Sequence, residues 1–133
     1  MGHPNEHRLR DLYALFARGD MPGFLAGCTD DVLFTVPGPN QITRGQASAV
    51  FTKENFGDLV TPVMQISGGS FSEEVIDVCA NDEHGVLLLV HRLQREGKPV
   101  EYRTAHVVQL TDGKIAAWQE WPGDLSGFGA AWK

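Results

Sequence analysis

The sequence of 133 residues contains little cysteine and comparatively little positive charge. Its two cysteines, Cys28 and Cys79, lie far apart and have no neighbours at metal-ligand spacing. We therefore expect buried, reduced thiols rather than a disulfide framework or a zinc site. Lys and Arg number 11 against 17 Asp and Glu, and no basic stripe is available to neutralise phosphates. This balance argues against nucleic acid and anionic membranes as partners.

Long apolar runs are also missing. The longest, Val86 to Val90, is about a quarter of the length that a membrane-spanning helix needs. The first residues lack the apolar core of a signal peptide, so we expect a cytoplasmic protein. Repeats and linkers are absent from the pattern as well, and the length predicts a single domain over residues 1–133, large enough to bury a core.

The first half of the sequence is dominated by helical patterns. Apolar residues at steps of three and four predict an amphipathic helix over Asn5–Arg18, and Asp20 is placed to cap a second, shorter helix. After a turn at 29–31, residues 32–36 have the composition of a strand. The remaining segments are a third predicted helix over 46–56 and residues 61–65, which fit a helical turn or a short strand equally well.

Strands and turns make up most of the second half. Strands are predicted over 71–80, 86–94, 100–110 and 114–121, each separated from the next by a turn. Asp124 can then cap a terminal helical turn that buries Phe128 and Trp132. Helices followed by a strand meander predict an α+β fold.

The turns and the hydrophobic pattern predict which side chains face inward. If Asp112-Gly113 lies in a three-residue loop, Leu110 opposes Lys114, and His106 and Glu120 become diagonal neighbours on the inner face. A two-residue loop would shift the pairing and place His106 opposite Gln119. The longer loop gives one coherent inner face, which carries Tyr102, Thr104, His106, Val108, Leu110, Trp118 and Glu120.

In the preceding hairpin, the loop length again decides which side chains face inward. A two-residue loop at Glu96-Gly97 pairs Arg92 with Glu101 on the outer face and His91 with Tyr102 on the inner face. A three-residue loop would send His91 outward. The sequence thus predicts titratable groups in an apolar concavity, an arrangement that invites a functional interpretation.

These elements, together with the segment His106–Ile115 and the run Trp118–Trp121, resemble the SnoaL-like proteins of the nuclear transport factor 2-like superfamily. The resemblance covers nearly the whole chain, including Arg18-Gly19-Asp20 between the helices and Asp30-Asp31-Val32 at the first strand. It implies a cone-shaped α+β barrel, in which the N-terminal helices pack on a curved, mostly antiparallel sheet. The superfamily includes isomerases, cyclases, dehydratases, epoxide hydrolases and noncatalytic binding modules, so the fold alone names no reaction.

Comparison with individual branches of the superfamily narrows the range of reactions expected of this sequence. The proton-shuttling Asp of the ketosteroid isomerases corresponds to Val36, and their oxyanion-binding Tyr falls at Leu12, with Tyr13 expected to point elsewhere. Their second Asp falls near His106. The limonene epoxide hydrolase type needs an Asp-Arg-Asp set, but Arg103 is predicted to face outward without a matching Asp.

Two branches share more with this sequence. The scytalone dehydratase type uses two inward histidines, which His91 and His106 resemble, but its remaining residues are not recognisable here. SnoaL-like cyclases resemble the chain most. They use a carboxylate and neighbouring polar groups to move a proton in an aldol-type ring closure without a cofactor.

From these comparisons we expect a cofactor-independent enzyme of the isomerase, cyclase or dehydratase type, acting on a small apolar carbonyl or aromatic compound. His106 and Glu120 are the candidate acid–base pair. The alternatives are a noncatalytic ligand-binding or subunit-association module and, third, an epoxide or related hydrolase. No metal or cofactor is expected, and the candidate substrate-binding residues are Trp118, Tyr102, His91, Phe34, Val36 and Leu89.

The outer face of the predicted sheet carries an unusual number of apolar residues. Trp121 would lie there beside Ala105, Val107, Ala117 and Val90. A large exposed apolar surface favours association, so the sequence predicts a homodimer that buries this face.

Overall fold

The chain begins with two helices, each started by a side-chain cap. In the computed structural model, which describes residues 2–133, α1 (Pro4–Ala17) follows His3, whose Nδ1 accepts from the backbone N–H of Asn5. The helix α2 (Met21–Ala26) follows Asp20, which accepts from the N–H of Gly23. Both predicted helices are confirmed within one or two residues, and the predicted apolar face of α1 is buried.

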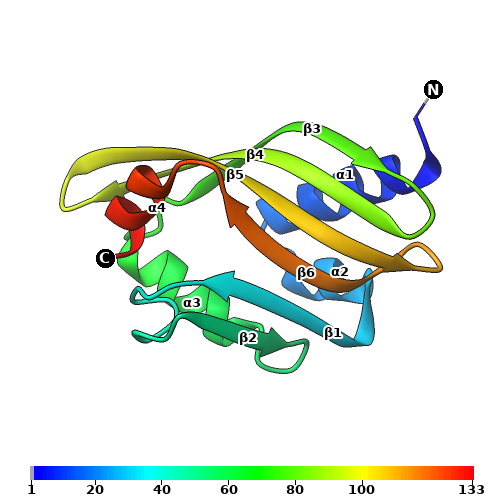
Figure 1. The fold of residues 1–133 in the computed structure, drawn as a ribbon, viewed down its shortest axis with the longest axis horizontal. Helices are drawn as coiled ribbons and strands as arrows, with labels where there is room; N and C mark the ends of the chain where they lie inside the picture. Colours follow the sequence, from blue (N-terminus) through cyan, green and yellow to red (C-terminus); the bar gives the residue numbers. More distant parts are fainter. Residues whose placement is uncertain (1) are drawn as a thin grey trace.

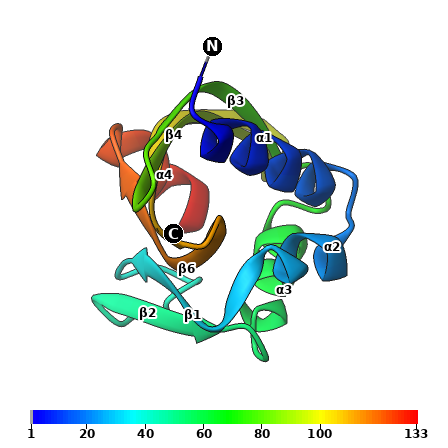
Figure 2. The same cartoon turned by 90° about the vertical axis from the view of Figure 1, so that its right-hand side faces the viewer.

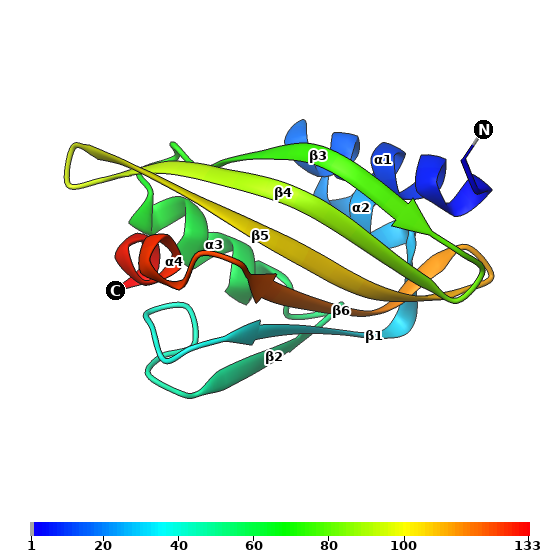
Figure 3. The same ribbon diagram turned by 45° about the horizontal axis from the view of Figure 1, so that its top comes forward.

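Six strands form one sheet in the order β2-β1-β6-β5-β4-β3, in which only β1 and β6 run parallel (Figure 1). Seen end-on, the sheet curls around an interior that α1, α2 and α3 close from the other side (Figure 2). The hairpin between β4 and β5 extends beyond the rest of the sheet (Figure 3). The remaining elements are β1 (Cys28–Pro37), β2 (Ser48–Thr52), α3 (Gly57–Ile66), β3 (Ser72–Ala80), β4 (His84–Arg95), β5 (Lys98–Thr111), β6 (Lys114–Pro122) and α4 (Leu125–Trp132).

The third predicted helix is wrong. Residues 48–52 form β2, which pairs antiparallel with the edge of β1, from Leu33 opposite Thr52 to Pro37 opposite Ser48. The apolar spacing of 46–56 fits a helix, but the unpaired backbone of β1 offers these residues a ladder of hydrogen bonds that local propensity cannot foresee. Residues 57–66 form α3, which includes Pro62 and settles the segment that fitted either a helix or a strand.

Two smaller expectations also need correction. The predicted turn at 29–31 lies inside β1, whose pairing with β6 is irregular between Cys28 and Leu33. Both cysteines are free, but Cys79 is exposed on the edge strand β3, and only Cys28 is buried. Within residues 2–133, each helix is too short or too polar to cross a membrane.

The hairpin between β5 and β6 has the predicted inner face, but its loop length and its register differ from the prediction. Asp112 and Gly113 both have positive φ, and Thr111 pairs with Lys114, so the loop has two residues rather than three. An irregularity between Gln109 and Leu110 then leaves one extra residue on β6. This bulge restores the inward parity of the strand and places His106 directly opposite Glu120, where a diagonal relation was expected.

The hairpin between β4 and β5 is as predicted. Glu96 and Gly97 form a two-residue loop with positive φ at both positions, as a type I′ turn requires. Arg92 pairs with Glu101 and His91 with Tyr102, so His91 faces inward. The inner-face residues from Tyr102 to Leu110, with Trp118 and Glu120, are all buried, whereas Glu101, Arg103, Gln109 and Gln119 are exposed.

Candidate active site

A cavity lies between the concave face of the sheet and the helices. Its volume is about 80 Å³, and because one enclosed water needs about 10–15 Å³, this space can hold a small ligand or a few waters. The walls are mostly aromatic and aliphatic, from α1, α3, α4 and the sheet. Met64 of α3 lines the cavity and is also partly exposed at the surface.

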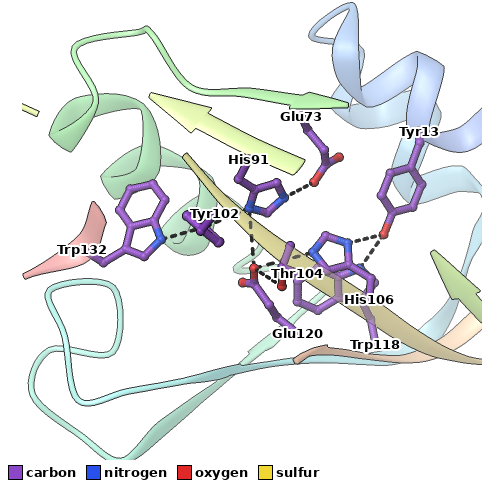
Figure 4. A network of polar contacts seen from close by, with 9 residues as sticks. All are labelled: Tyr13, Glu73, His91, Tyr102, Thr104, His106, Trp118, Glu120 and Trp132. Atoms are coloured by element: carbon purple, nitrogen blue, oxygen red, sulfur yellow. Dashed lines mark hydrogen bonds and ion pairs between the residues drawn. The ribbon is translucent and has the colours of Figure 1, made fainter. Parts of the chain in front are cut away.

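Four titratable side chains interrupt the apolar wall on one side. Glu73, His91, His106 and Glu120 come from the four successive strands β3, β4, β5 and β6, and all four line the cavity. Figure 4 shows the imidazoles of His91 and His106 side by side, with Glu120 below them and Glu73 at the far side of His91. Strand pairing causes this convergence, because Glu73 lies opposite His91 and His106 lies opposite Glu120.

One imidazole is held by a chain of hydrogen bonds that starts at Trp118. The indole Nε1–H of Trp118 donates to the hydroxyl oxygen of Tyr13 at 2.9 Å, and this hydroxyl lies 2.6 Å from Nδ1 of His106. Since an indole can only donate, the tyrosine oxygen accepts from Trp118, and its own hydrogen is available to Nδ1 of His106. Burial raises the pKa of Tyr13 well above its usual value, so the hydroxyl keeps that hydrogen. When the hydroxyl donates to Nδ1, neutral His106 carries its proton on Nε2.

The Nε2 atom of His106 is the one fully buried side-chain polar atom among residues 2–133 without a hydrogen-bond partner. Its nearest acidic atom is Oε2 of Glu120 at 3.9 Å, too far for a hydrogen bond. A buried N–H without an acceptor is costly, and native proteins rarely keep one without a reason. The atom is thus a donor whose acceptor is missing from the protein itself.

A second, parallel chain holds His91. The indole of Trp132 donates to the hydroxyl oxygen of Tyr102 at 2.9 Å, and this hydroxyl lies 2.8 Å from Nδ1 of His91. The same reasoning places the proton of neutral His91 on Nε2, which is 2.7 Å from Oε2 of Glu73. Burial alone lowers the pKa of His91, but the hydrogen bond and charge of Glu73, with the charge of Glu120, outweigh it and raise that pKa.

Glu120 lies between the two imidazoles that these hydrogen-bond chains hold. Its Oε2 accepts from the hydroxyl of Thr104 at 3.0 Å and lies 3.5 Å from Nδ1 of His91. Among residues 2–133 its other oxygen, Oε1, has no side-chain hydrogen-bond partner, and the residue lines the cavity. Burial favours the neutral acid, but His106, the charge of His91 and the Thr104 hydrogen bond outweigh it and lower the pKa of Glu120. The group is therefore an ionised carboxylate in apolar surroundings.

Three of the four groups also have the spacing of a metal site. Ligand atoms of Glu73, His91 and His106 lie within 4.8 Å of one another, and no other such cluster occurs within residues 2–133. A metal binds an unprotonated ring nitrogen, so its binding here would require each imidazole to release or move the proton of the nitrogen that faces the ion.

The predicted site residues are mostly brought together. His106, Glu120, Trp118, Tyr102, His91, Phe34 and Val36 all line the cavity. Leu89 does not; it is buried in the core beneath the lining, paired with Thr104 and Val75.

Three residues of the site escaped the sequence analysis. Tyr13 was expected to point away from the cavity but points into it, because the tilt of α1 over the sheet decides where its hydroxyl falls. Glu73 was not considered at all, although its pairing with the inward His91 follows from the β3–β4 register. Trp132 was expected to be buried, but nothing in the sequence indicated that its indole would bind Tyr102.

Comparisons with known proteins agree on one family. The family model described as a SnoaL-like domain matches residues 9–118. No curated protein matched the sequence. Among solved structures, Bal32a from a soil-derived mobile gene cassette is 20% identical, with a TM-score of 0.82 and coverage of 97% of this chain and 96% of that one.

Two further structures show how varied these relatives are. TerC, co-crystallised with polyporic acid, is 18% identical over 97% of this chain and 98% of that chain, with a TM-score of 0.80. An NTF2-like protein of unknown function from Burkholderia pseudomallei is 20% identical over 93% of both chains, with a TM-score of 0.74. At these identities the likeness establishes the fold and leaves the reaction open.

Proposed function

This chain belongs to the SnoaL-like domain family of the NTF2-like superfamily, and from that premise we propose that it is a cofactor-independent enzyme that moves a proton on a small apolar compound. Members of this fold include polyketide cyclases and other enzymes as well as proteins of unknown function, and the fold typically binds small ligands. The observation that carries the proposal is an apolar cavity lined by the ionised carboxylate of Glu120 and by His106, whose buried Nε2 has no hydrogen-bond partner and lies 3.9 Å from Oε2 of Glu120.

The two groups have complementary roles. Oε1 of Glu120 removes a proton from a carbon next to a carbonyl group, and the electrons of that C–H bond move onto the carbonyl oxygen. The Nε2–H of His106 donates to this oxygen as its negative charge develops, which is worth most in a site without bulk water. The proton on Glu120 then returns to another atom of the ligand, giving isomerisation, ring closure or loss of water.

The cavity also limits the compound. Apart from the cluster of titratable groups, its walls are formed largely by side chains such as Phe34, Phe56 and Trp118, which contact the apolar part of a ligand. A carbonyl or aromatic compound with a single polar end fits a cavity that is polar on one side and apolar elsewhere. The aromatic side chains pack against one another as well, with the ring centroids of Phe34 and Phe56 4.7 Å apart, so they keep the wall in shape.

The test replaces Glu120 by Gln, which keeps the shape of the side chain but cannot take a proton. The protein is incubated in deuterated water with a panel of ketones, phenolic polyketide-like compounds and epoxides, and mass changes are read by mass spectrometry. We expect exchange or conversion by the unaltered protein and a loss of rate of about 10²–10⁴-fold in Glu120→Gln.

The matched control is Glu101→Gln, the same change on the exposed face of β5, which should keep the full rate. Thermal stabilisation by some compounds, without a mass change in any of them, would contradict the enzyme and support the noncatalytic ligand-binding module. Conversion of epoxides alone would instead support the hydrolase.

The same fold also supports a proposal about assembly: a second copy of this chain covers the outer face of the sheet. Leu88, Ala105 and Trp121 lie in one row across β4, β5 and β6. Leu88 is 47% exposed and Trp121 is 58% exposed. Two copies that share a twofold axis would each bury this row against the other, which is the simplest self-complementary arrangement. Val90, also expected on this surface, is already buried within one chain.

A further inference from the structure

The two Trp–Tyr–His chains of the cavity end differently. The chain from Trp118 ends on His106, whose Nε2 has no hydrogen-bond partner in the part of the chain that the structure describes and which lines the cavity. The chain from Trp132 ends on Glu73, because Nε2 of His91 is already paired with that carboxylate. His91 therefore has no free atom to offer a ligand, and its contribution must act through another group.

That other group is Glu120. Nδ1 of His91 lies 3.5 Å from Oε2 of Glu120, so the carboxylate faces a lone pair or an N–H according to which ring nitrogen carries the proton. An N–H there would donate to Glu120 and make it a weaker base. The other titratable groups around this carboxylate are His106 from β5, Glu73 from β3, and the tyrosines Tyr13 and Tyr102.

Trp132 determines which ring nitrogen of neutral His91 carries the proton. A phenolic hydrogen lies near the plane of its ring in one of two directions, and the indole N–H of Trp132 occupies one side of the Tyr102 oxygen. With that side occupied, the hydroxyl hydrogen is directed toward Nδ1 of neutral His91, and the Nε2–H of His91 then donates to Glu73. The indole is itself held in place, since the carbonyl of Trp132 accepts from the N–H of Gln41 and Arg95 binds the neighbouring carbonyl of Ala131.

We propose that Trp132 is a positioning residue for Glu120: when His91 is neutral, Trp132 orients the Tyr102 hydroxyl toward Nδ1 of His91, which keeps this nitrogen unprotonated beside the carboxylate. The proposal deepens the proposed function and depends on it for its effect on rate, but not for its effect on His91. It also assigns α4 a role in the chemistry that packing alone would not give it.

The experiment compares Trp132→Phe with Trp118→Phe in protein labelled with ¹⁵N at histidine. In the unaltered protein, at a pH above the raised pKa of His91, we expect the His91 spectrum of an unprotonated Nδ1 and a protonated Nε2. Trp132→Phe should move the His91 signals toward the mixed or opposite tautomer and leave those of His106 in place. Trp118→Phe should do the reverse, which makes each variant the control of the other.

A second readout separates positioning from packing. In Trp132→Phe the plateau rate of deuterium exchange should fall about three- to tenfold, with the acidic limb of its pH profile moved to lower pH, because Glu120 has become the weaker base. Unchanged His91 signals in folded Trp132→Phe would overturn the proposal. If this variant does not fold, Tyr102→Phe removes the same hydroxyl hydrogen and must give the same change at His91.

These outcomes are distinguishable from failure of the proposed function. Should no compound exchange with the unaltered protein, the ¹⁵N spectra still decide whether Trp132 controls the tautomer of His91. Should exchange occur with normal His91 signals in both folded variants, Glu120 remains the base and the positioning role of Trp132 is wrong.

Discussion

At the scale of single residues, the site shows how one side-chain type takes two roles. His91 and His106 lie on adjacent strands with ring centroids 5.5 Å apart, and each accepts from a tyrosine. They differ only in what faces Nε2: a carboxylate for His91, and no protein acceptor for His106. This difference makes His91 a structural and electrostatic group and His106 the group available to a ligand.

The raised pKa of His91 predicts a pH dependence of stability. A raised pKa means that the folded state favours the protonated imidazole, so its stabilisation is complete below the unfolded value of about 6.5 and is lost as the pH rises through the folded value. Glu73→Gln removes the main cause of the shift. As the pH rises from about 6.5 through the folded pKa of His91, the free energy of unfolding of the unaltered protein should therefore fall relative to that of Glu73→Gln.

Urea unfolding at a series of pH values measures this difference. Glu74→Gln, an exposed neighbour paired with Arg92, is the control and should follow the unaltered protein. Parallel curves for the unaltered protein and Glu73→Gln would show that the Glu73 contact does not stabilise protonated His91.

At the scale of elements, the position of α4 depends on one close approach to the sheet. A Cβ added at Gly127 would lie 2.8 Å from the carbonyl oxygen of Glu101 and 2.8 Å from Cβ of Tyr102, neither of which can move freely. At Gly129, on the same helix, nothing lies within 4 Å. Substitution of Gly127 therefore tests the packing of α4 against β5, and substitution of Gly129 tests only the helical propensity of α4.

We expect Gly127→Ala to destabilise the protein by about 1–3 kcal/mol, since the helix must move away from β5. Gly129→Ala should be neutral or stabilising by up to about 1 kcal/mol, because alanine is the better helix former. Chemical denaturation measures both. Equal effects of the two substitutions would mean that α4 is not held against β5 as described.

At the scale of the whole molecule, the apolar row of Leu88, Ala105 and Trp121 is a surface that a single chain does not cover. Single exposed apolar residues are ordinary, but a contiguous row on a broad face indicates an interaction site. Trp121 adds a large aromatic surface to this row, with its indole nitrogen donating to Gln119 on the same strand.

We therefore expect the protein to sediment as a dimer and Leu88→Glu to dissociate it, because the charge would be buried against the second copy. Leu125→Glu is the matched control, since Leu125 is 75% exposed but lies on α4, outside the sheet. Analytical ultracentrifugation over a range of concentrations checks both variants. A monomer for the unaltered protein at all concentrations would contradict the assembly.

Much of this arrangement follows from the sequence, because it depends on local patterns. The apolar spacing of α1, the Asp20 and Asp124 caps, and the alternation along β5 act over a few residues, and each is confirmed. The hydrophobic alternation also predicted that His106 and Glu120 share the inner face, because the apolar residues of each strand recur at every second position.

The tertiary structure decided what depends on distant parts of the chain. Residues 48–52 became β2 because β1 offered an open edge, and the bulge in β6 placed His106 directly opposite Glu120. Tyr13 on α1 reaches His106 and Trp132 on α4 reaches Tyr102, from opposite ends of the sequence. Propensity and periodicity act along the chain, whereas these contacts exist only once separate elements pack together, and the proton positions of the site depend on them.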